Sequence, residues 1–218
     1  MCGCYADARE EELADALDVE VVAGHREPSR NIRPTQLVWV VAAAAQPGGG
    51  AAVREMGLAR WGLVPSWSKV LPSQPLINAR AETATVKPSF RVAAARRRAI
   101  LPAIGYYEWL ATPGGKTPYF LHRADDAVLG FAGLYEWWKV PDGVAVKGAE
   151  DGWLRSVTIL TRTAADSIGQ IHERMPVVVP RDLAHIWLDP ELTIPSDVDG
   201  LLRSFADPEL VPVQLSPA

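Results

Sequence analysis

The sequence begins Met1-Cys2-Gly3-Cys4, which places a cysteine directly behind the initiator methionine. Removal of Met1 would give Cys2 a free α-amine beside its thiol, two nucleophiles with reference pKa values of about 8 and about 8.5. With an aldehyde, such an amine forms a Schiff base, and the neighbouring thiol then closes a five-membered thiazolidine ring. The alternative interpretation is an ordinary cysteine on a frayed chain end. The chemistry of Cys2 therefore depends on what the rest of the chain places around it.

Glu108 is a candidate for proton transfer at such an amine. It lies among three aromatic residues, Tyr106, Tyr107 and Trp109, which favours partial burial and a raised pKa. A carboxyl group with a raised pKa can exchange protons closer to neutral pH than an exposed glutamate can. The competing interpretation is a strand residue that points at solvent.

Three further residues complement a Schiff-base reaction on a sugar aldehyde. His172 can serve as an acid or base at a sugar oxygen, because histidine titrates near neutral pH. Asn78 can orient the chain terminus without titrating, and Arg80 can hold a phosphate through a forked pair of hydrogen bonds. A lone histidine is more often structural than catalytic, so these roles require the residues to meet in space.

Short apolar runs between glycine, proline and polar residues predict many strands and a few short helices. Strands are expected at 37–45, 52–58, 99–103, 106–110, 119–122, 128–135, 153–160 and 210–213. Helices are expected at 10–17, 89–95, 164–170, 181–187 and 198–205. Residues 46–50 are predicted to be a flexible hairpin connection, 60–67 an ordered loop, and Asn78 the cap of a short helix. The fold class that follows is α+β, a mostly antiparallel sheet system with short flanking helices, in one domain spanning 1–218.

The composition excludes several classes of protein. The 218 residues are 48% hydrophobic and 22% charged, as in an ordinary globular domain. The two cysteines, one glycine apart, supply neither a disulfide framework nor a zinc cluster. No apolar run approaches the roughly 20 residues of a membrane span, and the first residues lack the pattern of a signal peptide. We therefore expect a monomer without metal or cofactor in the cytoplasm, associated with the nucleoid if the source is bacterial.

Charge and tryptophan placement leave two questions open. The net charge is −4, yet the stretch 80–98 carries six cations and a single acid, and ends in Arg96, Arg97 and Arg98. This stretch is either a local DNA-binding face, to which Arg96 and Arg97 would contribute, or a solvated helix end. Trp61 and Trp67 either form a stacking platform for bases or fill the core.

Five sequence blocks together resemble the SRAP family (SOS response-associated peptidase), in the order in which that family carries them. The blocks are Met1-Cys2-Gly3, Arg60-Trp61-Gly62-Leu63-Val64-Pro65-Ser66-Trp67, Asn78-Ala79-Arg80-Ala81-Glu82-Thr83, Gly105-Tyr106-Tyr107-Glu108-Trp109 and Ile171-His172-Glu173-Arg174-Met175-Pro176. Each block by itself is weak evidence for the family, whereas five blocks in the family's order over most of the chain are specific evidence.

The resemblance implies a sensor of abasic sites in single-stranded DNA that forms a covalent thiazolidine crosslink and thereby protects the lesion. It implies an α+β fold with a positively charged groove across the active site. Cys2 would be the nucleophile, Asn78 its orienting partner, Glu108 the proton shuttle and His172 the acid or base at the sugar. The DNA contacts that it implies are Arg80, Thr161 and Trp67.

The sequence departs from the family pattern at three positions, which bear on the contacts with DNA. Cys4 stands where the family usually has arginine, Arg162 where a second threonine is usual, and Ala165 where asparagine is common.

Two other functions stay open. One is a cysteine peptidase, self-processing hydrolase or lyase that uses the same Cys2. The other is a non-catalytic nucleic-acid-binding domain that does not need Cys2.

Overall fold

The structure, a computed structural model, describes residues 2–44 and 52–216 and has the expected α+β class with mostly antiparallel strands. The larger sheet contains, in spatial order, β10 (Ala149–Glu150), β11 (Trp153–Thr163), β9 (Leu129–Lys139), β6 (Arg98–Ala103), β3 (Leu37–Ala44), β4 (Val53–Trp61) and β2 (Val21–Val22). The short strands β5 (Asn78–Arg80) and β12 (Arg174–Pro176) pair with β11. The smaller sheet contains β1 (Tyr5–Ala6), β7 (Gly105–Thr112), β8 (Gly115–Arg123) and β13 (Leu210–Gln214).

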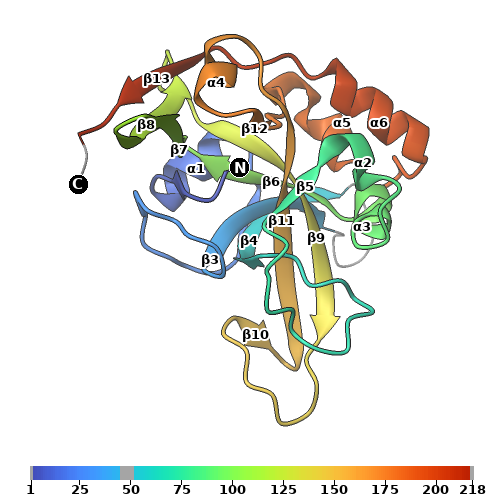
Figure 1. Cartoon of the computed structure of the whole chain (residues 1–218). Helices are drawn as coiled ribbons and strands as arrows, with labels where there is room; N and C mark the ends of the chain where they lie inside the picture. Colours follow the sequence, from blue (N-terminus) through green and yellow to red (C-terminus); the bar gives the residue numbers. More distant parts are fainter. Residues whose placement is uncertain (1, 45–51, 217–218) are drawn as a thin grey trace.

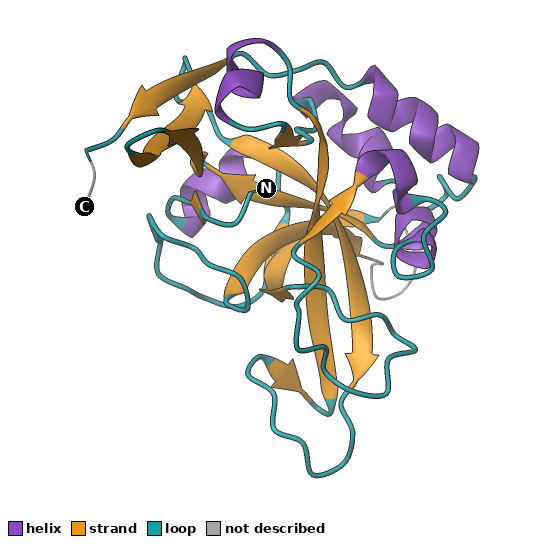
Figure 2. Cartoon of the chain, in the orientation of Figure 1, coloured by secondary structure: helices purple, strands orange, loops and turns teal. Residues whose placement is uncertain are grey.

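Short helices flank the two sheets (Figures 1 and 2). They are α1 (Glu10–Ala16), α2 (Ala81–Ala84), α3 (Arg91–Arg96), α4 (Asp166–Ile171), the 3₁₀ helix η1 (Arg181–Leu183), α5 (Ala184–Leu188) and α6 (Pro195–Ser204). Figure 1 shows α2, α3, α5 and α6 together on one side, while β9 and β11 run out of the body as a long arm. Within the described ranges, no helix has the length and apolar character that crossing a membrane requires.

The larger sheet is buried on both faces, as β3 illustrates. Its residues alternate between two core clusters, with Trp39 and Val41 packed in one cluster and Val38 and Val40 in the other. Because successive side chains of a strand point to opposite faces, an uninterrupted apolar run predicts burial on both sides. One cluster includes apolar residues of α1, α3, α5 and α6, and the other includes Cys2.

The loop prediction for 60–67 is partly wrong, because β4 continues through Arg60 and Trp61. Trp61 pairs with Val157 of β11, its side chain is fully buried, and its indole N–H donates to the carbonyl oxygen of Ile77 at 2.9 Å. These contacts lie far apart in sequence, so the local glycine and proline signal missed them. Trp61 is therefore a core residue, whereas 65% of Trp67 is exposed. The hairpin predicted at 46–50 lies outside the described residues.

The helix cap predicted at Asn78 is wrong. Asn78 lies in β5, which runs parallel to β11, and α2 begins only at Ala81. Pairing with a central strand has overridden the local cap signal. The side chain of Asn78 is thereby released from capping and faces the N-terminal segment.

The basic run at the end of α3 divides into three environments. Arg96 is exposed, and Arg97 forms an ion pair with Glu136 at 2.6 Å. Arg98 is only 4% exposed and donates to three backbone carbonyls, those of Ala94 at 2.8 Å, Trp187 at 2.7 Å and Asp189. Burial lowers the pKa of Arg98 to about 10. Sequence proximity alone therefore does not make these cations one DNA-binding face.

Arg98→Met is expected to destabilise the fold by about 3 kcal/mol, because two buried carbonyls and one partly buried carbonyl lose their donor, and each loss at a buried carbonyl costs roughly 1–3 kcal/mol. Arg96→Ala, two positions away on the exposed side, should change stability by no more than about 0.5 kcal/mol. Urea unfolding of both variants measures the difference. Equal urea midpoints for the two variants would show that Arg98 does not tie α3 and α5 to the sheet.

Candidate active site

The N-terminal segment is built into the core rather than frayed. Cys2 is fully buried and Cys4 is 3% exposed, so the frayed-end interpretation is wrong. Tyr5 pairs with Tyr106 of β7, and its ring packs edge-on against Trp61 at 5.3 Å between ring centroids. The backbone oxygen of Cys4 accepts a hydrogen bond of 2.9 Å from the N–H of Tyr107. Together, these contacts fix Cys2 beside the end of β7.

Asn78 holds the backbone of Cys2 in place. Its Nδ2 donates to the carbonyl oxygen of Cys2 at 2.9 Å, a contact between residues 76 positions apart. Asn78 itself is fixed by the pairing of β5 with Ile159 of β11. Its side-chain oxygen is buried without a hydrogen-bond partner among the described residues. A buried amide oxygen of this kind is positioned to accept a hydrogen bond from a ligand group.

Glu108 lies on the face of β7 that points into the protein and is 4% exposed. Burial raises the pKa of Glu108, and the neighbouring charge of His172 opposes that rise. The prediction of a buried carboxyl with a raised pKa is therefore confirmed. The group keeps its proton to a higher pH than an exposed glutamate and loses it as the pH rises through the raised value.

The Cys2 thiol is held in its neutral form. Burial raises the pKa of the thiol, and the nearby carboxylate of Glu108 raises it further. Glu108 therefore lies within electrostatic range of Cys2, and His172 within electrostatic range of Glu108. A neutral thiol is a poor nucleophile, so these surroundings do not activate the sulfur of Cys2.

His172 follows α4, which packs against β7. Its Nδ1 accepts a hydrogen bond of 3.0 Å from the backbone N–H of Arg174. The same Nδ1 lies 3.1 Å from the backbone oxygen of Arg174, so this nitrogen is engaged by its own loop in either tautomer. The backbone of Arg174 thereby fixes the orientation of the imidazole ring.

Arg174 has a supporting role that the motif analysis did not assign. Its guanidinium binds both carboxylate oxygens of Glu82, at 2.7 and 2.9 Å, and donates to the backbone oxygen of Thr161 at 2.5 Å. The ion pair joins the block that contains Asn78 to the block that contains His172. Opposite charges in two separate motif blocks are a signal that could have suggested this pair.

The predicted DNA contacts fall into two groups. Arg80, Trp67 and Arg96 are exposed. Thr161 is 1% exposed, and its hydroxyl donates to the carbonyl oxygen of Ala79 at 3.5 Å, while Arg97 is engaged by its ion pair. Arg80 follows Asn78 by two residues on β5, which places its exposed side chain next to the Cys2 site.

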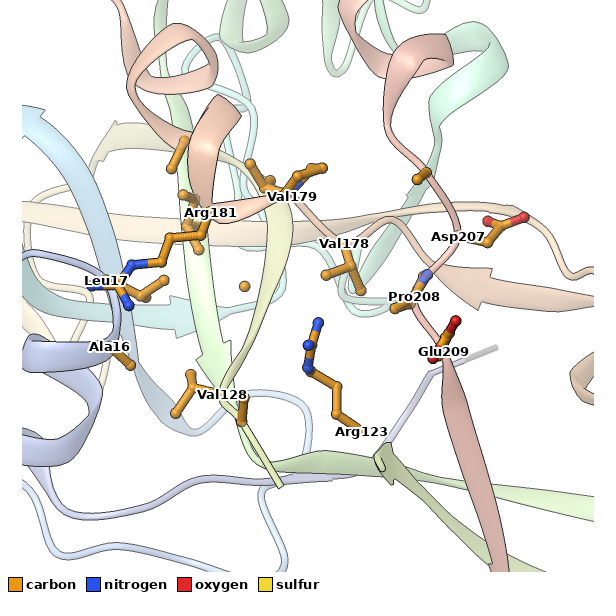
Figure 3. Close-up of a pocket in the computed structure, with 16 residues that line it drawn as sticks. Ala16, Leu17, Arg123, Val128, Val178, Val179, Arg181, Asp207, Pro208 and Glu209 are labelled. Atoms are coloured by element: carbon orange, nitrogen blue, oxygen red, sulfur yellow. The ribbon is translucent and has the colours of Figure 1, made fainter. Parts of the chain in front are cut away.

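A cleft of about 530 Å³ lies elsewhere in the fold, and Figure 3 shows Arg123 pointing into it toward Val178. The predicted site residues are absent from its described lining. Its two arginines already have partners, since Arg123 binds Asp125 at 2.6 Å and Arg181 binds Asp18 at 2.6 Å. This cleft is therefore not the candidate site. Within the described residues, no cluster of three or more His, Cys, Asp or Glu side chains could hold a metal ion.

Comparison with known proteins gives a family model that matches the whole chain and relatives that match all or part of it. A family model described as SOS response associated peptidase (SRAP) matches residues 1–218. Abasic site processing protein YoqW of Bacillus subtilis (strain 168) is 31% identical over 221 residues, which cover 99% of this chain and 92% of the relative. Abasic site processing protein HMCES of Gallus gallus is 34% identical over 154 residues, which cover 60% of this chain and 44% of the relative.

Solved structures from Bordetella bronchiseptica share the fold. A protein from this organism has a TM-score of 0.79 at 25% identity, covering 99% of this chain and 100% of that one. A phage-related protein from the same organism has a TM-score of 0.71 at 28% identity, with coverage of 99% and 95%.

Proposed function

Because the chain belongs to the SOS response associated peptidase (SRAP) family, we propose that it processes abasic sites in DNA as one domain spanning residues 1–218. Its curated relatives, of which YoqW is one, are abasic site processing proteins. The specific reaction proposed is a covalent crosslink between Cys2 and the ring-opened sugar of an abasic site in single-stranded DNA. The observation that carries this proposal is the buried Cys2, held by Asn78 and flanked by Glu108.

The reaction begins with the α-amine that removal of Met1 gives to Cys2. The amine nitrogen attacks the aldehyde carbon C1′, and the carbinolamine loses one water to form a Schiff base. The thiol sulfur of Cys2 then adds to C1′, and its proton passes to the nitrogen. One C–N and one C–S bond are formed, one water leaves, and no oxidant or reductant is required. The neutral thiol of Cys2 fits this order, because the amine attacks first.

Glu108 and Asn78 have different roles at the amine, proton transfer and positioning. Glu108, whose pKa burial raises, takes a proton from the attacking nitrogen and returns one to the departing hydroxyl. Asn78 holds the Cys2 carbonyl through its Nδ2, which fixes the direction of the amine. The Oδ1 of Asn78, which accepts no hydrogen bond from the described residues, is available to a hydroxyl of the opened sugar.

His172 acts on the sugar rather than on the amine. An abasic deoxyribose is mostly a closed ring, and ring opening requires a proton at the ring oxygen. His172, whose Nδ1 is engaged by the backbone of Arg174, gives that proton from its protonated imidazolium form. Arg80 supplies a phosphate contact beside the site, and Trp67 packs against the flanking bases. Contributions from Thr161, Arg96 and Arg97 to DNA binding stay predictions.

Incubation of Met1-processed protein with an abasic single-stranded oligonucleotide tests this function. A protein–DNA adduct that survives denaturation is expected with the abasic strand and not with the same strand carrying an intact base. A duplex that carries the same lesion measures the preference for single strands. Failure to form any denaturation-resistant adduct would contradict the proposal.

His172→Ala is expected to slow crosslinking to a deoxyribose abasic site by about 10²-fold, the usual contribution of one acid–base group. With a strand that carries an acyclic aldehyde in place of the sugar, no ring has to open, so the variant should match the wild-type rate within a few-fold. Single-turnover rates on the two strands separate the roles. An equal loss on both strands would place His172 at the amine instead.

A cysteine peptidase that uses the same Cys2 is the second candidate, and the family description names that activity. Catalytic cysteines usually have a lowered pKa, whereas burial raises the pKa of Cys2. This difference favours the amine-first reaction. Turnover of peptides in the absence of DNA would instead support the peptidase, provided that Cys2→Ser abolishes this turnover.

A third candidate is a non-catalytic DNA-binding domain. It would be supported if Cys2→Ala still binds DNA and the wild type forms no covalent product.

A further inference from the structure

Tyr106 carries a buried hydroxyl that no step of the proposed reaction involves. Its side chain is fully buried, and its phenolic oxygen has no hydrogen-bond partner among the described residues. A buried tyrosine normally directs its hydroxyl to a partner, because an unmade hydrogen bond in the interior is costly. A buried polar group without a partner is therefore a candidate for a functional group, whose partner arrives with the substrate.

The fold places Tyr106 beside the reacting residue. Tyr106 pairs with Tyr5, three positions after Cys2, and belongs to the same buried cluster as Cys2. It precedes Glu108 by two positions on β7, and because side chains alternate along a strand, the two face the same side. Both are buried, whereas Tyr107 between them is partly exposed. Tyr106 and Glu108 therefore face the interior on the side of β7 where Cys2 lies.

The hydroxyl of Tyr106 stays protonated. Burial raises the pKa of this hydroxyl, and negative charge on Cys2 and on Glu108 raises it further. Tyr106 thus lies within electrostatic range of both groups. A hydroxyl that keeps its proton throughout the working pH range cannot act as a general base. It acts instead as a neutral hydrogen-bond donor.

The ring of Tyr106 is held in place by packing. It lies edge-on to Phe131, with 5.9 Å between the ring centroids. The backbone of Tyr106 is paired on both sides, with Tyr5 of β1 and with Leu121 of β8. A donor that is fixed in this way does not have to reorganise when charge develops near it, which is the condition for strong electrostatic stabilisation in a dry site.

The aldehyde oxygen is the substrate group that needs such a donor. When the α-amine of Cys2 attacks C1′, the electron pair of the C=O bond moves to the oxygen, which becomes negative before it takes a proton. In the proposed reaction Glu108 brings that proton, so the oxygen has to lie close to both Glu108 and Cys2. Tyr106 faces the same region.

We propose that the Tyr106 hydroxyl is a further catalytic group, which donates a hydrogen bond to the aldehyde oxygen of the opened sugar while the amine attacks. This inference rests on the proposed function, because it needs the aldehyde at Cys2. Glu108 passes a proton from the attacking nitrogen to the negative oxygen. The hydroxyl so formed keeps the hydrogen bond from Tyr106 until it leaves as water. Tyr106 itself neither gains nor loses a proton.

Single-turnover crosslinking by Tyr106→Phe tests this role, because phenylalanine keeps the ring and removes only the hydroxyl. On a strand that carries an acyclic aldehyde, the variant should crosslink about 10²–10³-fold more slowly, the usual loss when one donor to a developing oxyanion is removed. His172→Ala should keep nearly the wild-type rate on the same strand. Tyr135→Phe removes a hydroxyl from a ring that lies under Arg155 on β9, and this matched control should react like the wild type.

The Cys2→Ser background isolates the attack of the amine. Without the sulfur only the Schiff base forms, and borohydride trapping measures its rate of formation. Addition of Tyr106→Phe to Cys2→Ser should lower the trapping rate by about 10²-fold or more. A loss that is seen only when the sulfur is present would place the hydroxyl at the thiol and would overturn the assignment to the aldehyde oxygen.

Urea unfolding separates this role from a structural one. Because the hydroxyl has no partner among the described residues, Tyr106→Phe should unfold at the same urea concentration as the wild type or at a higher one. A lower urea midpoint would show that the hydroxyl is already engaged in the fold and would overturn the inference. A wild-type rate of Tyr106→Phe on the acyclic strand would overturn it as well. Absence of any adduct from the wild type would contradict the proposed function instead.

Discussion

Cys2→Ser is expected to abolish the denaturation-resistant adduct while keeping a transient Schiff base that borohydride can trap. Serine behind Met1 still leaves an α-amine after methionine removal, so attack on the aldehyde proceeds. Its hydroxyl is a much weaker nucleophile than sulfur and does not close a stable ring. Denaturing electrophoresis with and without borohydride measures both products.

Cys4→Ser is the matched control for Cys2→Ser. Cys4 has no free α-amine and hydrogen-bonds Asn31, so its replacement leaves the amine–thiol pair of Cys2 intact. A stable adduct from Cys2→Ser, or its absence from Cys4→Ser with Cys2 intact, would move the reacting sulfur to Cys4 and contradict the thiazolidine at Cys2.

We expect the proposed crosslink to reverse slowly by the same steps in the opposite direction, which releases the DNA. Glu108→Gln should slow both formation and reversal by about 10²–10⁴-fold. The amide keeps the shape of the side chain but carries no exchangeable acid proton. Wild-type reversal, which needs a protonated Glu108, should become slower as the pH rises through the raised pKa of this group. Reversal by Glu108→Gln should lack that pH dependence. Single-turnover assays across the pH range measure both rates.

The sign of the Glu108→Gln effect separates proton transfer from simple electrostatics. The Glu108 carboxylate raises the pKa of the Cys2 thiol, so its removal favours the thiolate. A purely electrostatic role would therefore make the variant faster in ring closure. An unchanged or faster variant would remove Glu108 from the role of proton shuttle.

Local sequence patterns predicted the strands well where burial is uniform. The run that became β3 was expected at 37–45 and is observed at Leu37–Ala44. The aromatic neighbours of Glu108 left both burial and exposure open, and the position of Glu108 on the core-facing side of β7 decides for burial. Asn78 contacts Cys2 directly, and Glu108 and His172 lie within electrostatic range of that site, while the catalytic roles of these residues stay predictions.

The features that sequence analysis missed all depend on partners far along the chain. Asn78 was expected to cap a helix, because its strand pairing with β11 is not encoded locally. Arg96, Arg97 and Arg98 are adjacent in sequence, yet only the packing of α5 decides that Arg98 is buried. The pairing of Arg174 with Glu82 likewise spans 92 positions. Such contacts are set by topology rather than by residue spacing.

The intact mass of the purified protein, before and after reaction with an abasic oligonucleotide, tests the amine-and-sulfur chemistry of Cys2 most directly. The adduct is expected to have the mass of the chain without Met1, plus that of the oligonucleotide, minus one water. An adduct that retains Met1 would leave no free amine on Cys2, and would therefore contradict a thiazolidine at that residue.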